Sequence, residues 1–97
     1  MIQSFFDQGT EDVFNGKDTK AARKTLPRDV LTIGRRKLDQ LNQAARLDDL
    51  RAPPGNRLEA LKGDRKGQHS IRINDRFRIC FVWTEGGPDQ VEITDYH

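Results

Sequence analysis

Basic side chains gather between residues 51 and 81, where a concentration of positive charge could bind a polyanion. This stretch has eight basic and three acidic residues, a net charge of +5, whereas the rest of the chain has nine basic and twelve acidic residues, or −3. Each Lys or Arg that neutralises a phosphate releases a condensed counterion, so the stretch suits phosphate binding. An ordinary solvated surface explains the charge alone equally well. The basic residues are Arg51, Arg57, Lys62, Arg65, Lys66, Arg72, Arg76 and Arg78.

Two of these arginines are expected on one face of a β-sheet. Residues 77–83 alternate in polarity, so that the large apolar side chains share one face of a strand and Arg78 points to the other. Arg72, between Ile71 and Ile73, points the same way from the preceding predicted strand. Like charges on neighbouring strands repel each other, and a bound anion would relieve this repulsion. The apolar residues of the alternation are Phe77, Ile79, Phe81 and Trp83.

Hydrophobic periodicity predicts the elements that precede this sheet. Residues 2–6 alternate like a short strand, and Thr10, followed by two acidic residues, is a candidate N-cap for a brief helix. Residues 15–26 contain few large apolar side chains, which predicts a mobile basic loop that orders on binding. Pro27 suits the first turn of a longer helix with an apolar stripe facing the core. The stripe consists of Val30, Ile33, Leu38, Leu41 and Ala45.

From residue 57 onward the apolar period changes to two. We predict strands over residues 58–61, 69–73, 77–83 and 91–95, separated by turns rich in Gly, Asn, Asp and Pro. Together these elements predict an α+β fold, with two N-terminal helices packed on one face of a mainly antiparallel sheet of about four to five strands. The sequence shows no internal repeat, and residues 1–97 are expected to form a single domain.

Composition excludes several classes of protein. The single cysteine, Cys80, cannot form an internal disulfide, which fits a reducing cytoplasm. The N-terminal residues lack a signal-peptide pattern, and the longest apolar run, residues 79–83, is too short to span a bilayer. The sequence has no Cys and His cluster, Walker loop or dinucleotide fingerprint. We therefore expect a cytoplasmic protein without a metal, a cofactor or a membrane association.

Four segments carry a family resemblance. They are GNRLEALKGDR at residues 55–65, GQHSIRIN at 67–74, FRICF at 77–81 and the ending DYH at 95–97. In this order and spacing the sequence resembles HigB toxins of the RelE superfamily, also called plasmid maintenance killer proteins, over nearly its whole length. A three-residue ending alone would mean little, but the four segments together are specific.

The resemblance implies a fold, an activity and partners. The fold would be RelE-like, and the activity would be metal-independent cleavage of mRNA during translation on the ribosome. The toxin would be neutralised by a HigA-type antitoxin that carries a helix-turn-helix domain, so its contact with operator DNA would be indirect, through the antitoxin. The implied partners are therefore the antitoxin, the ribosome and mRNA.

The resemblance also implies a set of catalytic residues. Metal-free RNA cleavage requires a base for the 2′-hydroxyl, positive charge for the phosphate and an acid for the 5′-oxygen. Lys62 and Arg78 match basic family positions and are candidates for stabilising the phosphate. His97 is the candidate for proton transfer, more readily as acid than as base, because Asp95 favours its charged form. Asp95 would orient a neighbour or act as base, and Tyr96 would stack on a base or bind a phosphate. His97 as a frayed end and Tyr96 as sheet packing remain alternatives.

One position departs from the family pattern. Glu59 stands where some HigB proteins have a histidine with a catalytic role, and it reads either as a substitute base or as an exposed strand glutamate. His69 stands where the family commonly has an aromatic residue, which favours stacking or packing over proton transfer. A second group of residues is expected to hold RNA, mainly through backbone phosphates. This group consists of Arg57, Arg65, Lys66, His69, Arg72 and Arg76.

Two other functions fit the same sequence. A basic sheet could occupy the ribosome or ribosomal RNA and inhibit growth without efficient cleavage, and the absence of a histidine at Glu59 supports this reading. The chain could also serve chiefly as a co-repressor, joining its antitoxin on operator DNA. An intact DYH ending favours the nuclease over a protein that has lost its toxicity.

Overall fold

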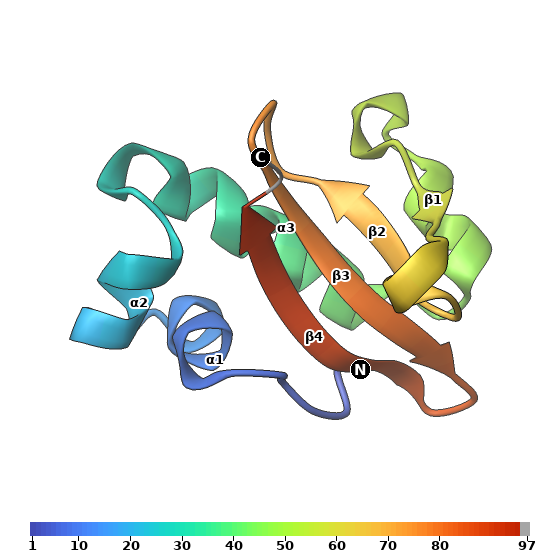
Figure 1. The fold of residues 1–97 in the computed structure, drawn as a ribbon, viewed down its shortest axis with the longest axis horizontal. Coiled ribbons are helices and arrows are strands. Elements are labelled where there is room, and N and C mark those ends of the chain that lie inside the picture. Colours follow the sequence, from blue (N-terminus) through green and yellow to red (C-terminus); the bar gives the residue numbers. More distant parts are fainter. Residues whose placement is uncertain (96–97) are drawn as a thin grey trace.

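An antiparallel sheet of four strands, in the order β1-β2-β3-β4, forms the C-terminal half of the fold (Figure 1). The computed structural model describes residues 1–95. Strand β1 is only Glu59–Ala60, β2 is His69–Arg72, β3 is Phe77–Thr84 and β4 is Gly87–Asp95. Consecutive strands pair as hairpins, as the alternating sequence predicted, and the register places Arg72 opposite Arg78.

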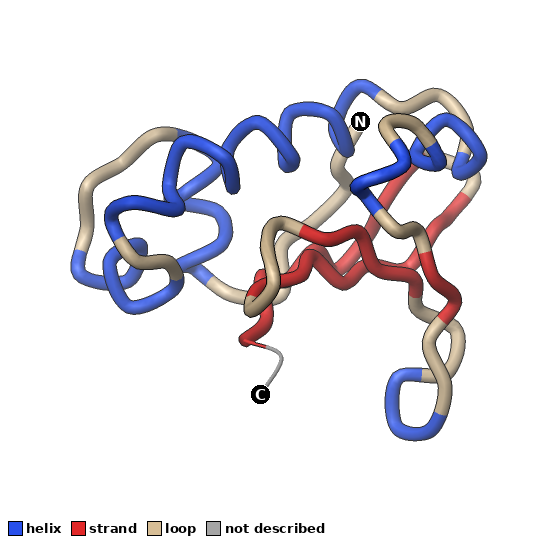
Figure 2. Tube along the Cα trace, turned by 90° about the horizontal axis from the view of Figure 1, so that it is seen from above, coloured by secondary structure: helices blue, strands red, loops and turns tan. Residues whose placement is uncertain are grey.

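Three α-helices precede the sheet, the last of which covers one of its faces, while the first two lie beyond its β4 edge (Figure 1). They are α1 (Gln8–Asn15), α2 (Lys20–Thr25) and α3 (Leu31–Gln43). Short 3₁₀ turns lie at Arg28–Val30, Leu47–Arg51, Pro54–Asn56 and Gly63–Arg65. Seen from above, α3 lies on one side of the sheet, α1 and α2 lie beside its edge, and the last of these turns projects on the other, open side (Figure 2). The predicted α+β class is therefore confirmed, with one α-helix more than expected.

The core lies between the helices and the inner face of the sheet. Burying these side chains is the main favourable term that fixes the helices on the sheet. Phe77, Ile79 and Phe81 point inward from β3, as their alternation predicted. Their buried apolar partners are Val13, Ala22, Leu26, Leu38, Leu41, Leu50, Ile71, Ile73, Val91 and Ile93.

The expectation of a loop over residues 15–26 is wrong. This segment contains α2, which begins after Thr19, whose hydroxyl accepts a hydrogen bond from the backbone N–H of Ala22. Ala22 and Leu26 are buried in the core, at 2% and 1% exposed. Small side chains form this interface, because Gly9 of α1 faces Thr25 of α2 at close range. A helix packed through small residues carries almost no hydrophobic periodicity in its sequence.

Helix α1 begins at a different residue from the one that the sequence predicted. Asp7, not Thr10, is the N-cap, since its Oδ1 accepts the backbone N–H of Thr10 at 2.8 Å. Thr10 instead lies one turn inside α1 and is fully buried. Its Oγ1 accepts the backbone N–H of Ile93 at 3.0 Å, which ties α1 to β4. The hydroxyl therefore anchors helix to strand rather than capping the helix.

The predicted strand over residues 2–6 is reduced to one bridge, in which Phe5 pairs with Val91 in parallel. The long helix is shorter than predicted, because α3 ends at Gln43 and leaves Ala45 exposed. Ile33 is 43% exposed, so its place in the predicted core is wrong. The buried face of α3 consists of Leu38 and Leu41, as predicted, together with Gly34, where an added Cβ would lie 2.5 Å from Leu26 Cδ1. Within residues 1–95, no helix is both long enough and apolar enough to cross a membrane.

The close approach of α1 and α2 predicts a large effect of one methyl group. A Cβ at Gly9 would lie 1.9 Å from Thr25 Oγ1 and 2.8 Å from the carbonyl oxygen of Ala21. Overpacking should outweigh the gain in helix propensity, so Gly9→Ala is expected to lower the free energy of unfolding by about 1–2 kcal/mol. Gly55→Ala is the matched control, because nothing lies within 4 Å of its added Cβ. Chemical denaturation measures both, and equal stabilities would contradict the tight α1–α2 contact.

The Asp12 carboxylate predicts a pH dependence of stability. It accepts hydrogen bonds from Thr19 Oγ1 at 2.6 Å and from Gln8 Nε2 at 2.8 Å, which together with nearby Lys17 lower the pKa of Asp12. A lowered folded-state pKa stabilises the protein above the unfolded value and loses this effect as the pH falls through the folded value. Asp12→Asn should therefore lower the Tm at pH 7, and its deficit against wild type should shrink below about pH 4. A deficit that stays constant with pH would refute this role of the charge.

Candidate functional site on the open face of the sheet

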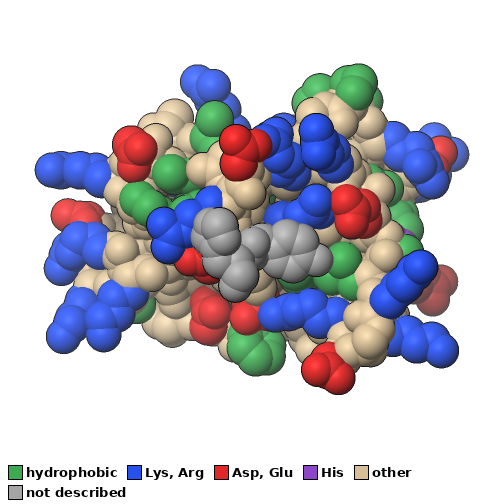
Figure 3. All heavy atoms as spheres, turned by 45° about the horizontal axis from the view of Figure 1, so that its top comes forward, with side chains coloured by type: hydrophobic (Ala, Val, Ile, Leu, Met, Phe, Trp, Pro, Cys, Tyr) green, Lys and Arg blue, Asp and Glu red, His purple; other side chains and the backbone are tan. Residues whose placement is uncertain are grey.

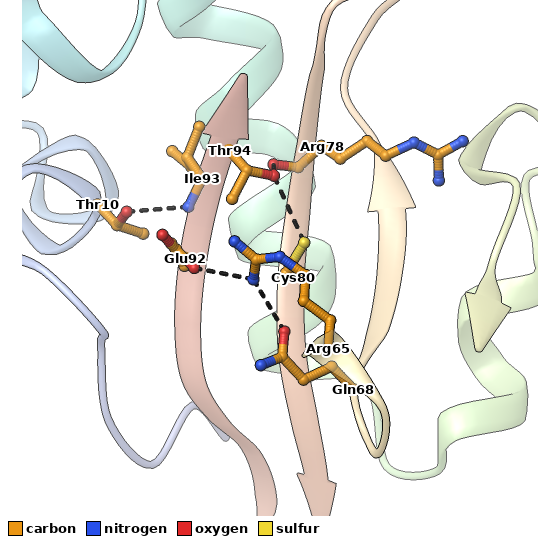
Figure 4. A network of polar contacts seen from close by, with 8 residues as sticks. All are labelled: Thr10, Arg65, Gln68, Arg78, Cys80, Glu92, Ile93 and Thr94. Atoms are coloured by element: carbon orange, nitrogen blue, oxygen red, sulfur yellow. Dashed lines mark hydrogen bonds and ion pairs between the residues drawn. The ribbon is translucent and has the colours of Figure 1, made fainter. Parts of the chain in front are cut away.

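Arg78, near the beginning of β3, lies on the open face, where Ser70 and Glu59 are among the partners of its guanidinium group. Its Nη1 donates to Ser70 Oγ at 2.8 Å, and its Nη2 lies 3.0 Å from Glu59 Oε1. The side chain extends from β3 toward β1, away from Thr94 of β4 (Figure 4). Only 12% of it is exposed. An arginine fixed in this way presents a preorganised positive charge, which is what recognition of a phosphate requires.

Arg72 lies on the same face, opposite Arg78 in the β2–β3 register. The predicted juxtaposition of the two arginines is therefore confirmed. The expected unrelieved repulsion is wrong, because Arg72 forms an ion pair with Asp75 and Arg78 forms one with Glu59. The chain supplies a carboxylate for each guanidinium, and an incoming phosphate would have to compete with these carboxylates.

Arg65 reaches across the open face from the turn Gly63–Arg65. Its Nη1 forms an ion pair with Glu92 Oε1 at 3.1 Å and donates to Gln68 Oε1 at 3.0 Å. Figure 4 shows the side chain passing in front of β3 at Cys80. Cys80 points to the open face as predicted, yet it is only 1% exposed. Arg65 thus fastens the turn to the sheet, and Lys62 immediately precedes this turn.

Arg76 and Asp95 are joined at the end of the sheet. Arg76 Nε and Nη2 both donate to Asp95 Oδ2, at 2.9 and 2.6 Å. The hydrogen bonds and charge of Asp95 raise the pKa of Arg76 above its already high ordinary value. The guanidinium also lies 5.1 Å from the centre of the Phe77 ring. The other two candidate residues of the predicted DYH group, Tyr96 and His97, lie outside the described residues.

Three basic residues remain exposed and form no ion pair within residues 1–95. Lys62 and Lys66 flank the turn that Arg65 fastens, and Arg57 follows the turn Pro54–Asn56 with a left-handed φ of 46°. Long side chains of this kind can meet phosphates without first giving up an internal partner. The five remaining basic residues of the stretch 51–81 have acidic partners: Arg51, Arg65, Arg72, Arg76 and Arg78.

The surface reflects this balance of charge. Figure 3 shows Lys and Arg side chains over the sheet side and the helix side of the molecule, with Asp and Glu side chains among them. The positive stretch in the sequence is therefore not one unbroken patch in space. Within the described residues, no group of three or more His, Cys, Asp and Glu side chains could hold a metal ion.

His69 is separated from the other predicted site residues. It pairs with Phe81 in the register, and the two rings stack on the covered side of the sheet with centroids 6.3 Å apart. Its Nδ1 is buried and has no hydrogen-bond partner within residues 1–95. The ring thus packs inside the protein, which is one of the two roles expected for it, and its predicted contact with RNA stays a prediction. Alternation explains the separation, because the neighbouring Ser70 is the residue that faces Arg78.

Glu59 forms a contact with Arg78 that the sequence analysis did not predict. It is half-exposed, and its carboxylate contacts the Arg78 guanidinium from strand β1. The register explains the contact, because Glu59 pairs with Ser70 and Ser70 pairs with Cys80, the second residue after Arg78. A strand of two residues gives almost no periodic signal, so only its departure from the family pattern pointed to this position.

Comparison with known proteins agrees with this arrangement. Residues 3–97 match the family model of the RelE-like toxin of type II toxin–antitoxin system HigB. The chain is 40% identical to Toxin HigB-1 of Vibrio cholerae over 86 residues, which cover 89% of this chain and 87% of that protein. It is also 34% identical over 58 residues to an uncharacterised protein of Haemophilus influenzae, covering 60% of this chain and 57% of that protein.

A solved structure shares the fold. The YoeB–YefM complex from Staphylococcus aureus contains a chain that superposes with a TM-score of 0.60 at 13% sequence identity. The match covers all of this chain and 98% of the other. Together with the open antiparallel sheet and Arg78 on it, the family match settles the classification: this chain belongs to the RelE-like HigB toxins of type II toxin–antitoxin systems.

Proposed function

We propose that this toxin is a metal-independent endoribonuclease that cuts mRNA on the ribosome. It acts in the cytoplasm, residues 1–97 form one catalytic domain, and a HigA-type antitoxin neutralises it. The observation that carries the proposal is the contact between Arg78 and Glu59 on the open face, at 3.0 Å. A guanidinium and a carboxylate in contact provide two groups that RNA cleavage needs, a phosphate ligand and a proton acceptor.

The reaction divides among these side chains. A base removes the proton of the 2′-hydroxyl, the 2′-oxygen bonds to phosphorus, and the bond from phosphorus to the 5′-oxygen breaks as an acid protonates that oxygen. Arg78 and Lys62 stabilise the negative charge that accumulates on the phosphate. His97 is the proposed acid, because an imidazolium can give up a proton near neutral pH. Tyr96 stacks on a base or hydrogen-bonds the phosphate.

Glu59 is the better candidate for the base than Asp95. Asp95 Oδ2 already accepts two hydrogen bonds from Arg76. Glu59 is half-exposed and touches the guanidinium that would bind the scissile phosphate, so its carboxylate would lie near the attacking hydroxyl.

The same ion pair offers a reason for dependence on the ribosome. A phosphate that binds Arg78 must compete with Glu59 for a side chain that is only 12% exposed. Free RNA would supply little energy for this exchange, whereas mRNA held in the ribosome is already positioned and loses less entropy on binding. The exposed Arg57, Lys62 and Lys66, with Arg72, would hold RNA phosphates around the site. Ribosome binding through these residues without cleavage is the second candidate function.

Cleavage of mRNA in a reconstituted translation reaction tests the proposal. Wild-type protein is expected to cut end-labelled mRNA only when ribosomes are present. Arg78→Ala, Glu59→Gln and His97→Ala should each lower the rate by about 10²–10⁴-fold, the usual loss of a proton-transfer or charge-stabilising group. Arg51→Ala, which removes an exposed arginine paired with Asp48, is the control and should stay within about twofold, as for a typical exposed pair. Translation inhibited with intact mRNA would instead support the ribosome-binding function.

The cleavage rates of two variants, at Arg65 and at Glu92, show whether Arg65 positions Lys62 or binds RNA directly. If Arg65 positions Lys62 through its ion pair with Glu92, then Arg65→Ala and Glu92→Gln should slow cleavage by similar factors, and the double variant should be no slower than either. If Arg65 binds RNA directly, Arg65→Ala alone should slow cleavage, and Glu92→Gln should preserve or raise it. Single-turnover cleavage rates distinguish the two patterns. Equal rates for wild type and Arg65→Ala would contradict both roles.

A further inference from the structure

Strand β1 carries Glu59 but has little pairing of its own to hold it in place. It consists of two exposed residues at the edge of the sheet, where it pairs with β2 (Figure 1). Short exposed segments of this kind open locally with little loss of free energy. After the strand, the backbone N–H of Leu61 donates to Gln68 O at 2.9 Å. The position of Glu59 therefore also depends on how the chain is held just before it.

Asn56 ends the last turn before β1 and is fully buried. Its Nδ2 lies 3.1 Å from Gln40 Oε1, and it also donates to the backbone carbonyl oxygens of Leu50 and Ala52, at 3.1 and 3.3 Å. Its Oδ1 accepts a hydrogen bond from Lys37 Nζ. The nitrogen thus meets only acceptors and the oxygen meets a donor, which fixes the orientation of the amide. Asn56 joins this turn to helix α3, which contributes the lysine and the glutamine.

Arg57 connects the buried amide to β1 through an unusual backbone conformation. Its φ of 46° lies in the left-handed region, where a residue other than glycine persists only if its surroundings hold it. Its backbone N–H donates to Pro54 O at 3.2 Å, and the next residue, Leu58, packs against the core. The direction in which the chain enters β1 is therefore set by the turn that Asn56 holds.

We propose that Asn56 is a positioning residue that keeps Glu59 against the Arg78 guanidinium. The inference rests on the proposed function, in which Glu59 is the base. Asn56 is fully buried and acts through Glu59 without touching RNA. Without its hydrogen bonds the chain would enter β1 differently, and a displacement of about 1 Å in a reacting group can lower a rate about 100-fold. Helix α3, behind the sheet, thereby helps to arrange a site on the open face.

The substitution Asn56→Asp tests this role with the smallest change of shape. The carboxylate keeps an oxygen for Lys37 but turns its second oxygen toward the acceptors that the amide nitrogen bound. Single-turnover cleavage of mRNA is measured over a range of ribosome concentrations. Asn56→Asp is expected to lower the maximum rate about 100-fold and to leave the half-saturating ribosome concentration within about threefold.

The matched control is Asn42→Asp, which adds the same charge at another side chain that is not exposed. The Asn42 Oδ1 accepts the backbone N–H of Ile2 at 2.8 Å, and a carboxylate can still accept this hydrogen bond. The control should keep its maximum rate within about threefold of wild type. An unchanged maximum rate in a folded Asn56→Asp variant, or equal losses in the two variants, would overturn the proposal.

A second variant decides the question if Asn56→Asp fails to fold. Lys37→Met removes the donor to the Asn56 oxygen and keeps most of the side-chain stem, and Arg36→Met removes the same charge at the exposed neighbouring position. Near-ultraviolet circular dichroism checks that each variant keeps its fold. Lys37→Met is expected to lower the maximum rate about tenfold, and Arg36→Met should stay within about threefold. Equal rates for the two folded variants would contradict the role of the amide.

Repeating Asn56→Asp in the Glu59→Gln background shows whether Asn56 acts through Glu59. If it does, the second substitution should slow cleavage by less than about threefold, because the group that Asn56 positions is already lost. A loss of about 100-fold in both backgrounds would indicate a general effect on the fold and would overturn the proposal. A higher half-saturating ribosome concentration at an unchanged maximum rate would assign the effect to Arg57 and would overturn it as well.

Nuclear magnetic resonance separates this inference from the nuclease function. The side-chain N–H resonances of Arg78 report its contact with Glu59 whether or not the protein cuts RNA. These resonances should shift in the same way in Asn56→Asp and Glu59→Gln, and in Asn42→Asp they should match wild type. Wild-type resonances in Asn56→Asp would refute the positioning role. Absence of cleavage by the wild-type protein would refute the nuclease function, whereas the Arg78 resonances would still decide what Asn56 positions.

Discussion

Strand β3 imposes a constraint on which the rest of this toxin depends. Its inward residues, Phe77, Ile79 and Phe81, hold the helices on the sheet, and the intervening Arg78 faces the other side. Because side chains alternate strictly along a strand, a register slip of one residue would expose the core and bury the arginine at once. The core and the proposed phosphate ligand Arg78 therefore share one strand.

The second organising feature is the compensation of charge. Most cations of the positive stretch meet a carboxylate inside the molecule, so the open face is a network of ion pairs rather than a bare basic patch. Partly buried pairs of this kind hold side chains in place more than they add stability. The exposed Lys62 and Lys66 supply the uncompensated charge next to this ordered network. The uncompensated charge and the side chains held by ion pairs thus belong to different residues.

The secondary structure of the C-terminal half could be predicted from the sequence more completely than that of the N-terminal half. From residue 57 onward, alternation of apolar residues and turn signals located the hairpins and placed Arg72 and Arg78 on one face, as the structure confirms. The elements of the N-terminal half were harder to predict from the sequence. Helix α2 packs against α1 at Gly9 and against the core through Ala22, and contacts between such small residues leave no hydrophobic stripe in the sequence. The Glu59–Arg78 contact could not be predicted either, since it depends on the register of a two-residue strand. Local periodicity predicts elements, whereas close packing and short edge strands are decided by the tertiary fold.

The first residues of the chain form contacts with strand β4, which is the last strand to be synthesised. The backbone N–H of Gln3 donates to Pro88 O, that of Phe6 to Val91 O, and the Thr10 hydroxyl accepts from Ile93. These particular contacts cannot form until strand β4 has been translated. A chain with such long-range closure completes its fold only late in its own synthesis.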